Sequence, residues 1–196
     1  MSRVRKPQQR STESATRVLA AARERFAVDG FDLVTIDAIA ADCGRTKGAV
    51  YHHFVSKEAL FEAVFGLEQR RIADVVVSQT SSTDPVVALQ DGLATYLTLI
   101  ASDPQAARIT LVDAPGVLGW QKWRSCDDGP FRALLTTAVR SIGEAGRLRD
   151  GLEADLLAEL LLGATTEAAL AVATSGTPPA SFTKTTSQLI EHITTP

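Results

Sequence analysis

The stretch that decides the fold covers residues 35–61 and reads TIDAIAADCGRTKGAVYHHFVSKEALF. Its first part predicts a short helix that Thr35 caps with its hydroxyl. This helix ends at Gly44, because glycine tolerates the left-handed backbone that a tight turn after a helix needs. Thr46 then caps a second helix that runs to about Phe54. The stretch therefore predicts two short helices joined by a glycine turn, which is the layout of a helix-turn-helix.

The second helix of this pair is expected to present a surface without acidic residues. Because Val50 faces inward, the opposite side of the helix carries Lys47, Gly48, Tyr51 and His52 toward solvent. Short side chains at Gly48 and Ala49 let the backbone approach a groove wall closely. Lys47 and Tyr51 can donate hydrogen bonds to phosphate oxygens. We therefore expect this helix to enter the major groove of double-stranded DNA.

A third helix begins directly behind this pair. Ser56 caps it and places Lys57 in the first turn, where free backbone N–H groups and the positive end of the helix dipole attract phosphate. Lys57 is therefore predicted to be the principal phosphate contact. His53 is left open between a DNA contact and a side chain that packs at the edge of the domain.

Residues 17 to about 63 resemble the DNA-binding domain of the tetracycline-repressor (TetR) family. The resemblance rests on TIDAIAADCG, TKGAVYHHF and SKEALF, which occur in the family's order behind an amphipathic helix. Arg45 departs from the pattern, since the family usually carries a small apolar residue after the turn glycine, and we expect it to reach the DNA. The predicted DNA-binding residues are Thr35, Arg45, Thr46, Lys47, Gly48, Ala49, Tyr51, His52 and Lys57. Taken singly, each also fits an ordinary polar helix face.

The charge of the chain is unevenly distributed. The net charge of the 196 residues is −3, which by itself argues against a nucleic-acid partner. Residues 1–60, however, carry 10 Lys or Arg against 7 Asp or Glu, whereas residues 61–196 carry 10 against 16. The net charges are therefore +3 and −6, and the basic part is the part that holds the motif.

The N-terminus and the cysteines indicate a bacterial cytoplasmic protein. Residues 1–10 contain four basic residues and no apolar run, so they predict a flexible basic arm rather than a signal peptide. This arm either adds DNA contacts or is a solvated tail. We expect no membrane-spanning segment. Cys43 and Cys126 predict neither a disulfide scaffold nor a metal site, and the adjacent His52 and His53 project in different directions on a helix.

The remainder of the chain also predicts helices, so the expected fold class is all-α. We expect a three-helix DNA-binding domain with its helix-turn-helix at residues 11–56, and a larger helical ligand-binding and dimerisation domain at residues 57–196. The expected helices cover approximately residues 11–28, 57–79, 85–102, 104–113, 131–146 and 152–175, and a last helix follows residues 178–179. The helix from residue 57 to 79 is longer than a DNA-binding unit needs, and it is expected to connect the two domains.

The helix at residues 152–175 predicts a homodimer. Its leucines cover more of its circumference than one core-facing stripe requires, and its alanines permit close approach of a second helix. The predicted interface residues are Leu156, Leu157, Leu160, Leu161, Ala164, Ala168, Leu189 and Ile193. A central helix in a monomer is the alternative, but the TetR resemblance implies a dimer with a four-helix interface.

The aromatic residues of the second domain either line an effector pocket or pack in its core. The resemblance implies a pocket for a small apolar effector among the middle helices. Arg108 and Asp113 are either polar anchors in this pocket or solvated ends of their helix. The predicted pocket residues are Tyr96, Ile100, Arg108, Trp120, Trp123 and Phe131. We find no enzyme motif in the sequence and expect neither a metal nor a cofactor.

The resemblance implies a dimeric transcriptional regulator, most often a repressor, that leaves a palindromic operator when its effector binds. The alternatives are a small-molecule binding protein whose helix-turn-helix has lost its role, or a helical enzyme that uses the cavity.

Overall fold

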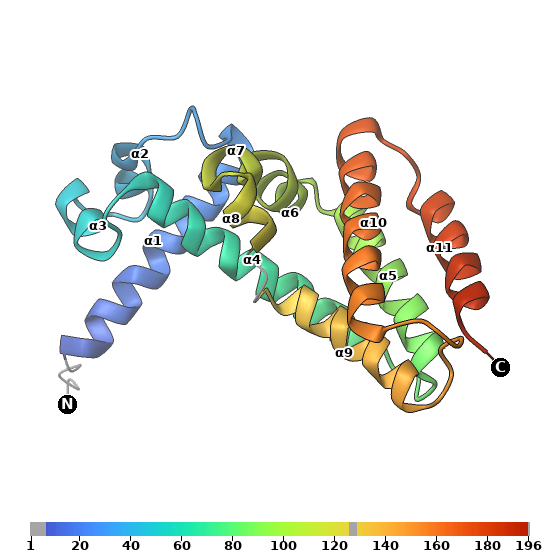
Figure 1. The fold of residues 1–196 in the computed structure, drawn as a ribbon. Helices are drawn as coiled ribbons and strands as arrows, with labels where there is room; N and C mark the ends of the chain where they lie inside the picture. Colours follow the sequence, from blue (N-terminus) through green and yellow to red (C-terminus); the bar gives the residue numbers. More distant parts are fainter. Residues whose placement is uncertain (1–6, 126–128, 196) are drawn as a thin grey trace.

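The predicted all-α fold is confirmed. The structure is a computed structural model that describes residues 7–125 and 129–195. Within these ranges the chain forms helices and no β-strand, with an isolated backbone bridge between Leu148 and Thr194. In Figure 1, α2 and α3 lie at one end of the molecule and α10 and α11 at the other, while α4 runs between them.

Three of the four N-terminal helices begin where their capping residues predict. Their bounds are α1 (Pro7–Asp29), α2 (Ile36–Asp42), α3 (Lys47–His53) and α4 (Lys57–Gln79). Thr35, Thr46 and Ser56 each accept a hydrogen bond at the start of the next helix, from the backbone N–H groups of Ala38, Ala49 and Ala59 at 3.1–3.2 Å. Gly44 has a φ of 63°, which fits the predicted left-handed turn.

The helix α1 is longer than its sequence predicts. It begins at Pro7 rather than at Ser11, so four residues of the predicted arm belong to this helix. Proline is well suited to the first turn of a helix, where its missing N–H would have no partner. Residues 1–6 of the predicted arm lie outside the described residues.

The second half of the chain contains α5 (Pro85–Ser102), α6 (Pro104–Ala107), η1 (Arg108–Asp113), α7 (Ala114–Leu118), α8 (Trp120–Ser125), α9 (Pro130–Glu144), α10 (Ala154–Ser175) and α11 (Pro179–Ile193). Asp84 and Asp103 cap α5 and α6 ahead of a first-turn proline, as the repeated Asp-Pro pairs predict. Helical structure, however, continues from Pro104 to Leu118 instead of ending near Asp113. Residues 126–128 of the predicted turn lie outside the described residues.

The segment η1 is a wide π-helical turn. Five residues after Thr110, Pro115 lacks the N–H group that such a turn would offer to the Thr110 carbonyl. The indole Nε1–H of Trp123 donates to that carbonyl instead, at 2.9 Å. The Thr110 hydroxyl donates to the carbonyl of Ala106 at 2.7 Å. These two bonds satisfy the carbonyl and hydroxyl groups of Thr110, which is buried in a segment that packs between α4 and α10.

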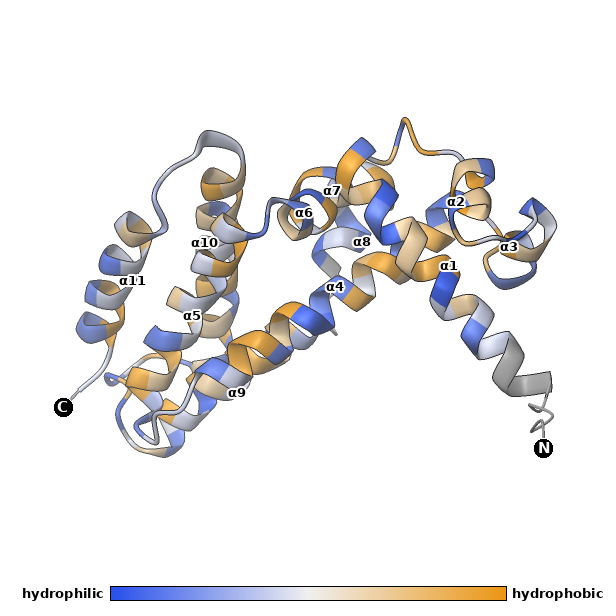
Figure 2. Ribbon diagram, turned by 180° about the vertical axis from the view of Figure 1, so that it is seen from behind, coloured by the Kyte–Doolittle hydropathy of each residue, from blue (hydrophilic) through white to orange (hydrophobic). Residues whose placement is uncertain are grey.

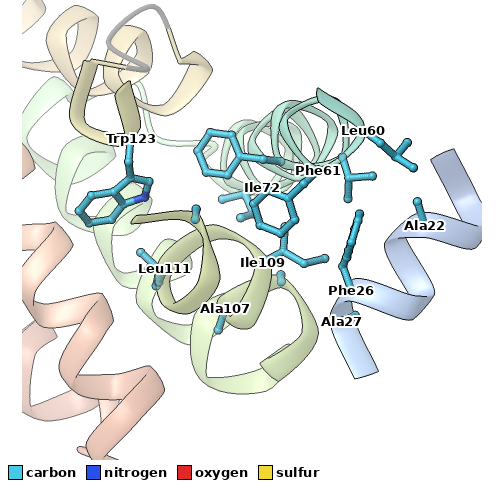
Figure 3. Close-up of a cluster of buried hydrophobic side chains, with 14 of the residues drawn as sticks. Ala22, Phe26, Ala27, Leu60, Phe61, Ile72, Ala107, Ile109, Leu111 and Trp123 are labelled. Atoms are coloured by element: carbon cyan, nitrogen blue, oxygen red, sulfur yellow. The ribbon is translucent and has the colours of Figure 1, made fainter. Parts of the chain in front are cut away.

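One hydrophobic core extends across the predicted domain boundary at residue 56. Phe26 of α1 and Phe61 of α4 are fully buried in edge-to-face contact, with ring centroids 5.2 Å apart. Figure 3 shows Ile109 of η1 beside these two rings. The same core continues to Trp123 of α8. The DNA-binding helices therefore share their packing with the second domain.

A second core lies at the far end of the molecule, where α5, α9, α10 and α11 meet. Figure 2 shows hydrophobic residues along α5, α9 and α10 in this region. By length and composition alone, α10 would be apolar enough to cross a membrane, contrary to the expectation that no segment would be. It packs against α9, α5 and η1, so part of its apolar surface belongs to the protein core.

An ion-pair network joins α1, α4 and the start of α6. The Glu68 carboxylate is buried and accepts from the Arg23 guanidinium at 2.6 Å and from the Arg71 guanidinium at 2.9 Å. Arg71 also contacts Asp103, the capping residue of α6, at 2.6 Å. A buried carboxylate is tolerated only when such partners compensate its lost hydration. The network therefore ties the first helix of the chain to the second domain.

We predict that Glu68→Gln lowers the free energy of unfolding by ~2 kcal/mol, because both arginines lose their shared carboxylate. Partial exposure of the arginines keeps this loss below that of a fully buried pair. Denaturant unfolding measures this loss in the free energy of unfolding. Glu24→Gln, an exposed change on α1, serves as the control and is expected to have little effect. Equal stability of the two variants would contradict the importance of the network.

Candidate functional site

The face of α3 that points away from the core is open to solvent. Val50 is fully buried, whereas Tyr51 is 43% exposed. The predicted DNA-binding residues Thr35, Arg45, Thr46, Lys47, Gly48 and His52 are also exposed, and Ala49 and His53 are half-buried. Because Gly48 has open space around its Cα, a DNA backbone can approach α3 closely at this point. The structure therefore brings these predicted residues together on one accessible surface.

This surface contains an ion pair that the sequence did not predict. The Lys47 ammonium contacts the Asp37 carboxylate of α2 at 2.8 Å, and both side chains are exposed. The hydrogen bond to Asp37 raises the pKa of Lys47 above its usual value. An exposed pair of this kind is weak, so Lys47 can exchange Asp37 for a phosphate. The two side chains come from different helices, and only their packing reveals the contact.

The structure gives Lys57 a different role from the predicted phosphate contact. Its ammonium donates to the carbonyl oxygens of Phe31 and Val34 at 2.8 and 3.0 Å and lies 4.1 Å from the centre of the Phe31 ring. The side chain is half-buried and bridges the loop between α1 and α2. Lys57 thus holds the loop that positions α2. The sequence did not reveal this contact, because the free N–H groups of a helix start do not determine where a long side chain turns.

Residues from α1 extend this surface beyond the predicted set. Ser11 and Ser14 lie with Arg45 and His52 along a groove of about 450 Å³ between α1 and α3. From the sequence, these serines were expected only to belong to the helix at residues 11–28. Their position near the basic N-terminus could have indicated DNA contacts, because serine hydroxyl groups can donate hydrogen bonds to phosphate oxygens.

The loop between α1 and α2 is also held from the second domain. Arg108 of η1 donates to the carbonyl of Val28 at 2.7 Å, and the Asp113 carboxylate accepts from the backbone N–H of Phe31 at 3.0 Å. A Cβ atom at Gly30 would lie 2.3 Å from the Arg108 guanidinium, so the close approach requires glycine. Arg108 and Asp113 therefore connect η1 directly to the helix-turn-helix.

Three of the six predicted effector residues line one cavity in the second domain. Tyr96, Trp123 and Phe131 border a space of about 80 Å³. The Tyr96 and Phe131 rings stack with their centroids 4.2 Å apart. Burial raises the pKa of Tyr96, so its hydroxyl keeps its proton at neutral pH. The cavity lies against η1, because Thr110 and Leu111 also form its wall.

The other three predicted pocket residues lie elsewhere. Trp120 is 57% exposed. Of the two tryptophans of α8, only Trp123 is buried against the core. Ile100 is buried in the core and, with Arg108, borders a different hollow of about 180 Å³. Arg108 and Asp113 are engaged with the α1–α2 loop, as described above. The sequence did not reveal this separation of the six residues, because sequence spacing does not show how α8 and η1 rotate against α4.

The predicted dimer residues divide between an outer face and the protomer core. Leu156 and Leu160 are 60% and 72% exposed, and Ala164 and Leu189 are also exposed, while Leu157 and Ile193 are half-buried. Leu161 and Ala168 are buried inside the protomer, so their assignment to an interface is wrong. They belong to the stripe of α10 that packs on α5, α9 and η1. The outer stripe of α10 remains uncovered in the protomer.

Among the described residues, no group of three or more His, Cys, Asp or Glu side chains is placed to hold a metal ion. Cys43 is half-buried and unbridged, and Cys126 lies outside the described ranges.

Comparison with known proteins places both halves of the chain in one family. The family description "Bacterial regulatory proteins, tetR family" matches residues 18–64, and "Tetracyclin repressor-like, C-terminal domain" matches residues 86–194. The chain is 30% identical over 142 residues to the HTH-type transcriptional repressor Rv1474c of Mycobacterium tuberculosis, covering 71% of this chain and 72% of that protein. The HTH-type transcriptional regulator UidR of Escherichia coli is 46% identical over 56 residues, which are 29% of each protein's length.

A solved TetR-family transcriptional regulator from Pectobacterium atrosepticum has the same fold, with a TM-score of 0.80 at 24% identity over 98% of this chain and 99% of that one. The chain belongs to the TetR family, whose members are DNA-binding transcriptional regulators with a helix-turn-helix.

We predict different effects for substitutions of Lys47 and Lys57. Lys47→Met should reduce the salt-dependence slope of DNA binding by ~0.9, the value of one lost phosphate contact, with little change in stability. Lys57→Met should leave that slope unchanged and lower the free energy of unfolding by ~1 to 3 kcal/mol, because two loop carbonyls lose a charged donor. Binding titrations at several salt concentrations and denaturant unfolding measure both. A reduced slope for Lys57→Met would show that Lys57 also contacts a phosphate.

Proposed function

We propose that this protein is a cytoplasmic transcriptional repressor that binds a palindromic operator as a homodimer and leaves it when a small apolar effector binds. The observation that carries the proposal is the exposed face of α3, which follows a capped glycine turn and has no acidic residue between Lys47 and His53. A helix of this kind fits the major groove, and the residues around it can fix its position on the phosphate backbone.

The uncovered stripe of α10 supports the homodimer. Leu156, Leu160 and Leu189 expose large apolar side chains on α10 and α11, at the opposite end of the molecule from α3. A second copy that covers this stripe would leave both α3 helices free, because they lie far from the contact. Twofold symmetry then predicts an operator with two related half-sites about one helical turn, ~34 Å, apart or somewhat more.

The contacts between η1 and the α1–α2 loop support a route for the effector response. Thr110 and Leu111 face the cavity, while Arg108 and Asp113 of the same short segment hold Val28 and Phe31. A ligand that displaces η1 would therefore also displace the loop, and it would tilt α4, which packs on η1. Release requires the effector to bind the DNA-incompetent form more tightly, and a coupling of ~1 to 3 kcal/mol changes operator occupancy several-fold or more.

Footprinting of the purified protein on the DNA that flanks its own gene tests the function. We expect a protected region with twofold symmetry, whose affinity falls as salt rises because phosphate contacts release counterions. A protein that only binds small molecules would protect no DNA. An asymmetric footprint would contradict the dimer model while leaving DNA binding in place.

The substitution Leu160→Glu tests the proposed dimer, because it places a charge in the centre of the exposed stripe of α10. We expect this variant to sediment as a monomer and to bind the operator at least ~10-fold more weakly, since the two half-sites no longer act together. The matched control is Leu33→Glu, which changes an equally exposed leucine in the DNA-binding domain, 79% exposed, and should leave the dimer intact. A dimeric Leu160→Glu protein would show that another face forms the contact.

A further inference from the structure

Two hollows of different character meet at the Phe131 side chain. On one side of it lies the cavity of about 80 Å³ that contains Tyr96 and Trp123. On the other side lies a groove of about 210 Å³ between α4, α5 and α9. Phe131 borders both spaces, is half-buried, and belongs to the first turn of α9. A rotation of this one ring would therefore join the two hollows into a longer site.

The smaller cavity contains a largely buried phenol. Tyr96 is 7% exposed and makes no hydrogen bond with the described part of the chain. Tyr96 is one of the described residues that line this cavity. The hydroxyls of Thr110 and Thr166 and the indole of Trp123 already donate to backbone carbonyls. Tyr96 is therefore available to donate to a ligand.

The described walls of this cavity are also cationic. They include the guanidinium groups of Arg124 and Arg132, the amide of Gln69, and no carboxylate. Arg132 also pairs with Glu159, while Arg124 lies over the Trp120 ring at 5.6 Å. Guanidinium, amide and phenol groups together favour a ligand group that accepts several hydrogen bonds and carries negative charge, as a carboxylate does.

The walls of the larger groove are apolar except at Thr80. Its walls are Val76, Val77, Thr80, Ala88, Leu89, Gly92, Leu93, Phe131, Leu134, Leu135 and Ala138. The hydroxyl of Thr80, the polar side chain among them, already donates to the carbonyl of Val76 at 2.8 Å. Gly92 leaves the floor of the groove without a side chain, and a Cβ there would make an ordinary van der Waals contact with Val76 at 3.6 Å. Such a groove favours a hydrocarbon chain without polar groups.

We propose that the effector is an amphipathic carboxylate, with its head group beside Tyr96 and Arg124 and an unbranched hydrocarbon tail in the α4–α5–α9 groove. Phe131 turns aside to let the tail pass. This proposal rests on the proposed function and names the chemical class of its effector. The head group would contact Thr110 of η1, the segment that holds the α1–α2 loop through Arg108 and Asp113.

Calorimetric titration of the full chain with straight-chain monocarboxylic acids of six to twelve carbons, and with the primary alcohols of the same lengths, tests the proposal. Each added methylene should tighten binding of the acids about 3- to 4-fold until the groove is filled. Each alcohol should bind at least ~10-fold more weakly than its acid, because the charged head group is missing.

Two variants separate the two ends of the site. Tyr96→Phe should weaken binding of decanoic acid ~10-fold, whereas Tyr51→Phe, the other tyrosine of the chain, should leave the affinity for this acid unchanged. Gly92→Leu fills the groove and should abolish the dependence on chain length. Equal affinity for acid and alcohol, or no effect of chain length in the unmodified protein, would overturn the assignment of head or tail.

The outcome is distinguishable from failure of the proposed function. If no acid binds while the footprint persists, the amphipathic site is wrong and the DNA-binding function stands. If the acids bind as expected but do not release the operator, the site stands and its role as the effector site is wrong.

Discussion

The packing of Phe26, Phe31 and Phe61 is the interaction on which the remainder of the structure depends. Their three rings lie 5.2–5.8 Å apart and join α1, the following loop and α4. Lys57 covers the Phe31 ring and fixes the loop carbonyls at the same point. Because α2 and α3 follow this loop in the chain, the direction in which α3 faces depends on the aromatic packing. Aromatic clusters of this size provide both buried area and a defined geometry.

The same cluster explains why the two functional regions are not independent. Ile109 of η1 packs beside Phe26 and Phe61, and the Glu68 network connects α1 to the start of α6. A helical connector with separate cores on either side would allow the domains to move freely. Here a shared core and buried ion pairs couple them, so a change at the cavity wall has a physical path to α3. Packed interiors transmit such shifts because they resist compression.

Much of the fold followed from local rules. The caps at Thr35, Thr46 and Ser56, the turn at Gly44 and the Asp-Pro helix starts all depend on interactions within four residues of the chain. Such interactions are legible in a sequence without knowledge of distant contacts. The π-helical segment was missed because its stability depends on Trp123, thirteen residues further along the chain. The loop contacts of Lys57 were not foreseen because its partners, Phe31 and Val34, are more than twenty residues away.

The sequence by itself therefore determined the all-α class, the helix-turn-helix and the exposed face of α3, since each depends on periodicity and on contacts between near neighbours. Only the tertiary structure decided which leucines of α10 face the core, which tryptophan borders a cavity, and which lysine lies on the exposed face of α3. Leu160 and Leu161 are adjacent and chemically identical, yet one is 72% exposed and the other 3%. The rotation of α10 against α5 and α9 separates them, and that rotation is set by the packing of these three helices together.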